Sequence, residues 1–252
     1  MLIGAILVVV GISALAAALV FPLEKLIPAT RRQPHNEVVG FVYAVMGVFY
    51  AVLLALVVVA VWDTLGEAQS NTFTEASALY QLDLYGHSLP QPQHAELEAL
   101  AKQYAMTVIN IEWPDLARQQ SSPQARALYR QLLFLVEAQQ PTAPAAVARY
   151  QQALDVVTEL GDARRERIDQ ATEGIPGLLW VALILGAVIT VGFAYFFGMK
   201  SAAAHAIVMF CLTLLVTSLL LVSYELDYPF SKGVRVSPLA FKVTVQRMEQ
   251  IP

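Results

Sequence analysis

Charge is the property this sequence has least of. Only 14% of its 252 residues are Asp, Glu, Lys or Arg, whereas 57% are hydrophobic. Soluble domains carry about 25% charged residues, so a soluble protein of this length would have too few charges to cover its surface. A mean hydropathy of +0.55 agrees. The composition therefore indicates a membrane protein and excludes an intrinsically disordered chain.

Cysteine and clustered basic residues are scarce as well. Cys211 is the single cysteine, which rules out a disulfide within one chain and argues against a cysteine-based metal site. The formal net charge is −4 and no basic patch stands out, so a nucleic-acid partner is not expected.

Signatures of catalysis are also missing. The sequence holds no Ser-His-Asp signature, P-loop or His-Glu-x-x-His motif. Two histidines and two glutamates lie near one another, but prolines interrupt the segment and the four need not share a face: His87, His94, Glu96 and Glu98. We predict no catalytic residues, no metal centre and no cofactor, and we do not expect an enzyme.

Four apolar runs are long enough to cross a bilayer as helices, which takes about 20 residues. They are 2–23, 38–62, 175–199 and 202–224. No Lys or Arg precedes the first run, so we expect a retained helix rather than a cleaved signal peptide. The predicted divisions are transmembrane helices one and two in 1–62, a helical cytosolic domain in 63–174, helices three and four in 175–224, and a cytosolic tail in 225–252.

The segment 63–174 is polar. It holds 8 of the 16 basic and 15 of the 20 acidic residues, and Ala, Gln, Leu and Glu dominate it. Helical spacing of apolar residues predicts helices over 96–113, 121–140 and 144–170, with Ser122 as a candidate N-cap before Pro123. The predicted fold class is therefore all-α, a polytopic membrane protein with a helical domain inserted between the second and third spans.

The distribution of basic residues near the spans favours one orientation. Six lie on the side of the insert and four on the other side, within about 20 residues of the spans. The first set is Arg164, Arg165, Arg167, Lys232, Arg235 and Lys242, and the second is Lys25, Arg31, Arg32 and Lys200. The excess predicts that the insert and both termini are cytoplasmic.

The second span carries a stripe of small residues at helical spacing: Gly40, Ala44, Gly47, Ala51 and Ala55. Small residues allow helices to approach closely in lipid. They also leave room for an ion where a helix lines a pore. Both interpretations stay open at this point.

Two acids follow where the second span ends. Asp63 and Glu67 come directly after Trp62, and the polar stripe continues with Ser70 and Asn71. A solvated helix end with Trp62 as an interfacial anchor is one interpretation. The other is an ion vestibule, because a carboxylate repeated around an oligomer axis forms a ring that favours cations.

The remaining spans offer less. None of the four predicted spans holds an internal Asp, Glu, Lys or Arg, which argues against an ion-coupled transporter. In the third span Gly186, Gly192 and Gly198 are expected to aid packing, and 195–197 read as an aromatic belt. His205, early in the fourth span, is expected at the membrane interface.

The segment after the fourth span indicates an ordered tail, with candidate packing residues Glu225, Asp227, Pro229 and Phe230. Pro229 would end the helix. One interpretation is a helix exit with local caps. The other is a tail folded onto the insert, with Glu225 or Asp227 paired to Arg164, Arg165 or Arg167.

Several segments together resemble the bacterial bestrophin-like membrane proteins, a family often catalogued only as a domain of unknown function. They are Gly40-Phe-Val-Tyr43, Gly47-Val-Phe-Tyr50, Trp62-Asp63, Glu112-Trp113-Pro114, Gly177-Leu-Leu-Trp180, Glu225-Leu-Asp-Tyr-Pro-Phe230 and Gly233-Val-Arg-Val-Ser-Pro238. The more distant similarity is to bestrophin ion channels. It implies an oligomeric channel of four spans with a helical cytosolic region, whose second span lines the pore.

Two departures from bestrophins matter. Val61-Trp62-Asp63 stands where bestrophins have an Arg-Trp-Trp-Glu type segment, so the basic residue is absent. Ser231-Lys232-Gly233 replaces their acidic calcium clasp, so calcium gating is not expected. Bestrophins pass anions, and the acidic exit of the second span points the other way.

The leading hypothesis is thus a homo-oligomeric channel, a tetramer or pentamer in the bacterial inner membrane, that conducts monovalent cations, K⁺ first. An anion (chloride) channel is the second hypothesis. A membrane scaffold or sensor without a pore is the third.

Overall fold

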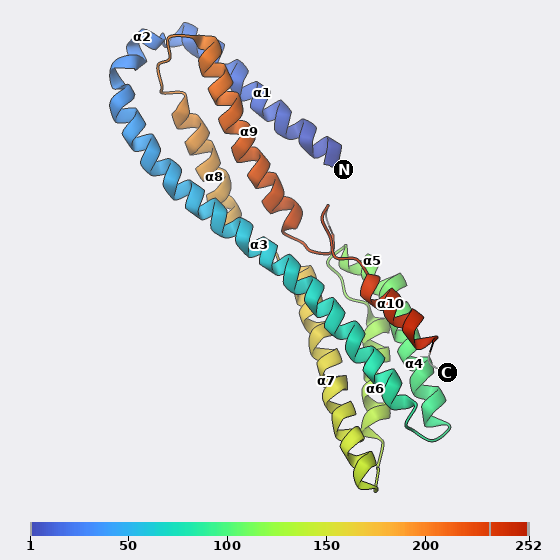
Figure 1. Ribbon diagram of the computed structural model, residues 1–252. Coiled ribbons are helices and arrows are strands. Elements are labelled where there is room, and N and C mark those ends of the chain that lie inside the picture. The colour runs from blue at the N-terminus through green and yellow to red at the C-terminus, as the bar shows by residue number, and fades with distance from the viewer. Residues whose placement is uncertain (1, 232, 251–252) are drawn as a thin grey trace. The chain divides into compact units, whose positions relative to one another are not determined.

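The computed structural model describes residues 2–231 and 233–250, and every regular element in those ranges is helical (Figure 1). The elements are α1 (Leu2–Leu26), α2 (Ala29–Arg32), η1 (Gln33–His35), α3 (Asn36–Gly86), α4 (Gln93–Thr107), η2 (Val108–Glu112), α5 (Trp113–Leu116), α6 (Pro123–Glu137), α7 (Pro144–Thr172), α8 (Gly177–Ala194), α9 (Ala202–Leu226) and α10 (Leu239–Met248). The all-α expectation is confirmed.

Four of these helices, α1, α3, α8 and α9, are long and apolar enough to cross a membrane, as expected from the four apolar runs. Several ends differ from the predicted ones, and two of these differences affect the packing. Helix α1 continues through Pro22 to Leu26 and so includes Glu24. Helix α8 ends at Ala194 rather than at 199, because the following residues turn into a connection whose Gly198 lies against backbone: a Cβ there would lie 2.5 Å from the Gln33 amide nitrogen.

The chain divides into two compact units, 1–62 with 175–227, and 63–174 with 228–252. We call them the membrane unit and the polar unit. Helix α3 contributes its first part to the membrane unit and its remainder to the polar unit. In the membrane unit α1 packs along α9, and α8 also contacts α9.

Helices α3 and α8 approach closely at one glycine. A Cβ built on Gly186 would lie 2.5 Å from the ring of Tyr50, so only glycine leaves room for that ring. Tyr50 there joins a small core with Leu54 and Leu183. The expected packing role is therefore present at Gly186. At Gly192, by contrast, a Cβ would meet nothing within 4 Å, so this glycine makes no close helix contact within the single chain.

The polar unit has the larger core. Helix α4 packs on α6, α6 on α7, and α10 on α4. Helix α6 begins as expected, since the Ser122 hydroxyl accepts a hydrogen bond from the Ala125 amide at 3.3 Å and Pro123 stands in the first turn. This cap satisfies one of the amides that a helix start leaves unpaired.

The helix expected over 96–113 is interrupted. Helix α4 runs into a π-helical turn, η2 (Val108–Glu112), and then into the short α5. A π turn inserts one extra residue into the helical repeat and so changes the face on which later side chains lie. Glu112, at the end of the turn, is fully buried.

Candidate functional site

The small-residue stripe lies on the membrane part of α3. Ala44, Ala51 and Ala55 are exposed in the membrane unit, and Gly40 and Gly47 are partly buried. A Cβ at Gly47 would meet open space, and one at Gly40 would lie 3.7 Å from Phe197. None of the five is therefore enclosed within the single chain, and the stripe is available to a neighbouring helix or to an axis.

A second exposed face of α3 consists of bulky apolar side chains. Phe41 is 74% exposed, Phe49 73% and Leu56 64%. The buried face is different and holds Tyr50 and Leu54. In the single chain, α3 thus presents both a small and a bulky apolar face that lipid or further subunits must cover.

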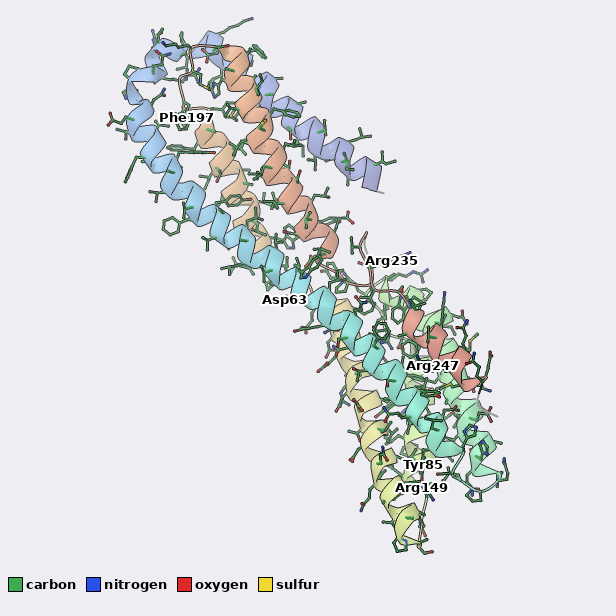
Figure 2. All side chains as sticks on the ribbon, viewed as in Figure 1. Asp63, Tyr85, Arg149, Phe197, Arg235 and Arg247 are labelled. Carbon is green, nitrogen blue, oxygen red and sulfur yellow. The ribbon has the colours of Figure 1, made fainter. Side chains whose placement is uncertain are left out.

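Asp63 and Glu67 are exposed on α3, and Figure 2 marks Asp63 on this helix. The continuity of α3 from Asn36 to Gly86 confirms that the acids belong to the same helix as the second span. Neither carboxylate has an ion-pair partner among the described residues. Both are thus available to water and ions.

A buried ionic network joins the helices of the polar unit, and its pairings were not predicted from the sequence. Arg167 on α7 donates to Glu75 on α3 at 2.5 and 2.9 Å and to Glu112 at 2.7 Å. Arg164 also binds Glu112, whose carboxylate accepts from the Ser122 amide as well. The π turn thus places Glu112 where two arginines converge. The Arg-Arg-x-Arg run at 164–167 was the available signal.

The neighbouring carboxylates and the burial of the network shift the pKa values of Arg167 and Tyr104. Burial alone would lower the pKa of Arg167, but the carboxylates of Glu75 and Glu112 more than compensate and raise it. The Tyr104 hydroxyl donates to Glu75 at 2.6 Å, and burial beside that carboxylate raises the pKa of the phenol well above its usual value. The Arg167 guanidinium also lies over the Trp113 ring at 5.4 Å. The network fits a structural role.

The contacts of Asp227, after the fourth span, differ from the interpretation in which it pairs with an arginine of the insert. Asp227 accepts hydrogen bonds from the Ile175 amide at 2.6 Å and from the Trp180 indole at 3.2 Å. The predicted pairing of Asp227 with an arginine of the insert is therefore wrong: Arg165 pairs with Asp162 on its own helix, and the other two arginines pair within the buried network. The Asp227 carboxylate is thus held by one backbone amide just before α8 and by one indole in its first turn.

The other tail residues pack as an ordered segment. Phe230 is buried against Trp113, with ring centroids 5.4 Å apart, and the Pro229 carbonyl accepts from the Val236 amide at 2.8 Å. Glu225 is partly buried in the last turn of α9. Lys232, used in the orientation count and in the Ser-Lys-Gly run, lies outside the described residues.

A second polar cluster occupies the membrane unit. Arg32 pairs with Glu24 and donates to the carbonyls of Tyr195 at 2.7 Å and Phe197 at 2.8 Å. His205 is buried within the protein, with Nδ1 3.9 Å from Glu24. Its position at the membrane interface stays a prediction. Arg32 caps the end of α8, where carbonyls lack helical partners, and the extension of α1 to Leu26 brings Glu24 to it.

The histidine pair considered for a metal is close but incomplete. The rings of His87 and His94 lie 4.4 Å apart, and buried Asp83 lies one turn before His87. Among the residues that the structure describes, no group of three or more His, Cys, Asp or Glu side chains is arranged to hold a metal.

The fold defines the class of this protein, and comparison with known proteins identifies its family. The class is a multi-pass helical membrane protein with four candidate spans and a polar helical unit. The model of the bestrophin-like domain matches residues 10–241, and the chain belongs to this family. Among curated proteins, none matches this sequence.

Solved structures share the fold at low sequence identity. A bacterial bestrophin homolog from Klebsiella pneumoniae is 14% identical, with 100% of each chain covered and a TM-score of 0.67. A single-residue variant of the Klebsiella pneumoniae homolog gives a TM-score of 0.72 at 12% identity, covering 96% of this chain and 98% of that one. A further structure, described as that of a membrane protein, is 13% identical and gives a TM-score of 0.69, with 96% of each chain covered. The expected bestrophin-like fold is confirmed.

Proposed function

We propose that this protein is the subunit of a homo-oligomeric ion channel, a tetramer or pentamer, whose pore is lined by the membrane part of α3 and which conducts monovalent cations, K⁺ first. The observation that carries the proposal is α3 itself. It runs without interruption for 51 residues and leads from exposed apolar faces to the exposed acids Asp63 and Glu67. The proposal includes no catalytic activity and no cofactor beyond the permeant ion.

Helical spacing refines which face turns to the axis. At about 100° per residue, positions seven or eleven apart share a face of any α-helix. Asp63 follows Leu56 by seven residues and Val52 by eleven, whereas it lies about 120° round from Ala51. If the acids face the axis, Val52 and Leu56 face it too, and the small stripe meets the neighbouring subunit. Close approach of helices at small residues supports this arrangement.

Selectivity follows from charge. Carboxylates repeated around a symmetry axis raise the local concentration of cations and exclude anions. Span two carries no basic side chain to offset them. The proposed orientation in the bacterial inner membrane, with the insert and both termini in the cytoplasm, puts these carboxylates at the cytoplasmic mouth.

The test is a reversal potential. Purified oligomer is placed in planar bilayers under a KCl gradient, and the same measurement is made on the double variant Asp63→Asn, Glu67→Gln. We expect a potential near the K⁺ equilibrium value that moves toward zero in the variant. The matched control is Asp155→Asn with Glu159→Gln, which removes the same charges from exposed positions on α7.

Other outcomes decide between the rivals. A potential near the Cl⁻ value would establish the anion channel. An oligomer of verified mass that never conducts, or a chain that stays monomeric, would favour the scaffold or sensor.

A further inference from the structure

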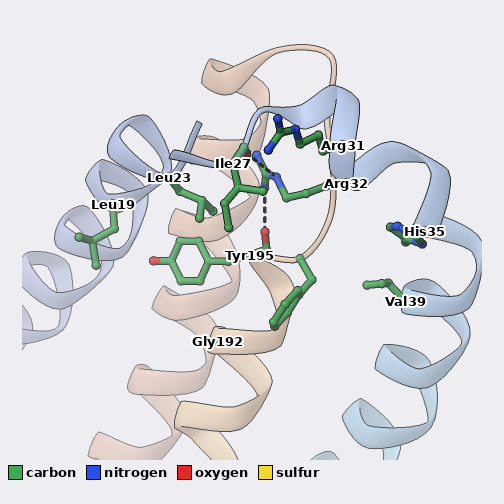
Figure 3. A pocket seen from close by; sticks show the side chains of 10 residues that line it. Leu19, Leu23, Ile27, Arg31, Arg32, His35, Val39, Gly192 and Tyr195 are labelled. Atoms are coloured by element: carbon green, nitrogen blue, oxygen red, sulfur yellow. Dashed lines mark hydrogen bonds between the residues drawn. The ribbon is translucent and has the colours of Figure 1, made fainter. Parts of the chain in front are cut away.

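A large apolar cavity opens in the membrane unit, beside the connection between α1 and α3 (Figure 3). Its volume is about 730 Å³, within the range of roughly 300–1,000 Å³ in which proteins hold small ligands. Its apolar walls come from α1, α3, α8 and the connections at this end: Leu19, Leu23, Ile27, Val39, Tyr195 and Phe196. All of these residues belong to the membrane unit.

Gly192 of α8 lines this cavity and leaves open space there. A Cβ on Gly192 would meet nothing within 4 Å, whereas the equivalent atom on Gly186 would collide with Tyr50. Gly192 is therefore not needed for a close helix contact. It leaves space, and an apolar space on the surface of a membrane helix bundle is filled by something apolar.

The charged residues at the cavity are basic. Arg31, Arg32 and His35 contribute to its lining, and no carboxylate does among the residues that the structure describes. Arg32 is committed, since it pairs with Glu24 and donates to three backbone carbonyls. The side chain of Arg31 is exposed and has no hydrogen bond or ion pair among the described residues. One guanidinium is thus free at the rim of an apolar cavity.

The position of the cavity at the ends of membrane-crossing helices indicates which class of ligand it can bind. Connections 27–35 and 195–201 join membrane-crossing helices at one end, and Asn36 binds Gly198 through two hydrogen bonds of 2.9 Å. Such helix ends lie at the level of lipid headgroups, with apolar residues just below them. A ligand here meets hydrocarbon in the cavity and a positive charge at the rim.

We propose that this cavity is a binding site for an anionic glycerophospholipid, with an acyl chain between α1, α3 and α8 and its phosphate on Arg31. A guanidinium presents paired donors that match phosphate oxygens. Basic groups at membrane boundaries attract anionic headgroups. The inference does not depend on the channel proposal, because it uses only contacts within the membrane unit.

The experiment uses the full chain reconstituted in vesicles that contain phosphatidylglycerol or phosphatidylcholine with a diazirine in the acyl chain. After irradiation, labelled peptides are mapped by mass spectrometry. We expect label on 19–27 and 192–196, roughly fivefold more with phosphatidylglycerol, as one basic group at a membrane surface allows. Arg31→Gln should remove that preference. Lys200→Gln, which removes an exposed charge outside the cavity lining, should not.

A cavity-filling variant provides an independent test. Gly192→Leu places a side chain in open space, so we expect it to fold, as judged by an unchanged melting temperature, and to reduce label from both lipids. Gly11→Leu, also in open space but on α1 outside the lining, is the control.

Two results would overturn the proposal. One is equal labelling by both lipids that Arg31→Gln leaves unchanged, which would mean ordinary contact with bilayer. The other is an absence of lipid label with cross-links between two copies of the chain at the cavity, which would mean that a neighbouring subunit fills it.

Discussion

Arg167 and Glu75 face each other in the core of the polar unit, joined by hydrogen bonds of 2.5 and 2.9 Å, and neither side chain is exposed to solvent. They are 92 residues apart in the chain. The pair ties α7 to α3, the helix that leads out of the second span. Removal of one partner would leave a buried charge unpaired, which is more costly than the loss of a surface ion pair.

The first prediction concerns this pair. Arg167→Gln should destabilise the protein by about 3–5 kcal/mol and lower its melting temperature in detergent by about 10 °C. Arg165→Gln, whose partner Asp162 is exposed, should cost about 1 kcal/mol or less. Equal melting temperatures for the two variants would contradict a stabilising role for the buried pair.

The second prediction concerns alkaline pH. Burial raises the pKa of Tyr104 well above its usual value, so the folded protein keeps the phenol protonated after the unfolded chain has lost that proton. The stabilisation is complete below about pH 10, the ordinary tyrosine value, and declines as pH rises further. Tyr104→Phe should flatten the alkaline fall in unfolding free energy, measured between about pH 7 and 11.

The control for that measurement is Tyr80→Phe, a partly buried tyrosine on α3. At pH 7 the Tyr104 variant should lose about 1.5–3 kcal/mol, because its hydrogen bond goes to a charged carboxylate. If both variants show the same alkaline profile, the raised pKa does not contribute to stability.

The third prediction compares two glycines of α8. Gly186→Ala forces a methyl group into the ring of Tyr50 and should cost about 1–3 kcal/mol. Gly192→Ala meets open space and should be neutral or stabilising by up to about 1 kcal/mol, the gain in helix propensity. The measurement is the melting temperature of both variants in the same detergent. A second replacement, Tyr50→Leu, removes the ring and should restore part of the stability that Gly186→Ala loses.

The fourth prediction tests the contacts of Asp227. Asp227→Ala removes the acceptor for the Ile175 amide and the Trp180 indole and should cost about 1–3 kcal/mol. Glu173→Ala, an exposed acid shortly before α8, should have no effect beyond about 0.5 kcal/mol. The readout is the melting temperature followed by fluorescence; no difference between the variants would show that these bonds are not needed.

The fifth prediction distinguishes the two faces of α3. In a Cys211→Ser background, Leu56→Cys should react with a charged, water-soluble thiol reagent and lose current. Ala51→Cys should react slowly, because that face meets a neighbouring helix. Leu185→Cys, on an exposed part of α8, is the lipid-facing control. Block at Ala51→Cys with none at Leu56→Cys would assign the pore to the small stripe.

Hydropathy and spacing predicted much of the fold. Each apolar run contains enough residues to cross a bilayer, so four helices were evident without any contact information. The Ser122 cap and the continuity of the second span into a polar stripe were also readable, because both depend on neighbours within a few residues.

The ion pairs and polar contacts could not be predicted from hydropathy and spacing. Glu24 lies just beyond the end of the predicted first span. It forms an ion pair with Arg32 and lies near His205 only because the connections at that end of the membrane unit fold together. The π turn that buries Glu112 has no pattern of its own in the sequence. Which acid pairs with which arginine depends on where helices distant in sequence meet, and many pairings satisfy charge equally well.

The sequence by itself determined the membrane class, the helical fold, the order of the elements and a small stripe followed by two acids on one helix, because hydropathy and helical periodicity are local properties. Only the tertiary structure decided that Arg167 binds Glu75 and that Asp227 binds the Ile175 amide and the Trp180 indole. It also decided that Gly192 lines an open cavity, whereas Gly186 lies against the Tyr50 ring. Those outcomes depend on the distance and direction between side chains that the chain brings together from far apart, and the composition of a segment does not contain that information.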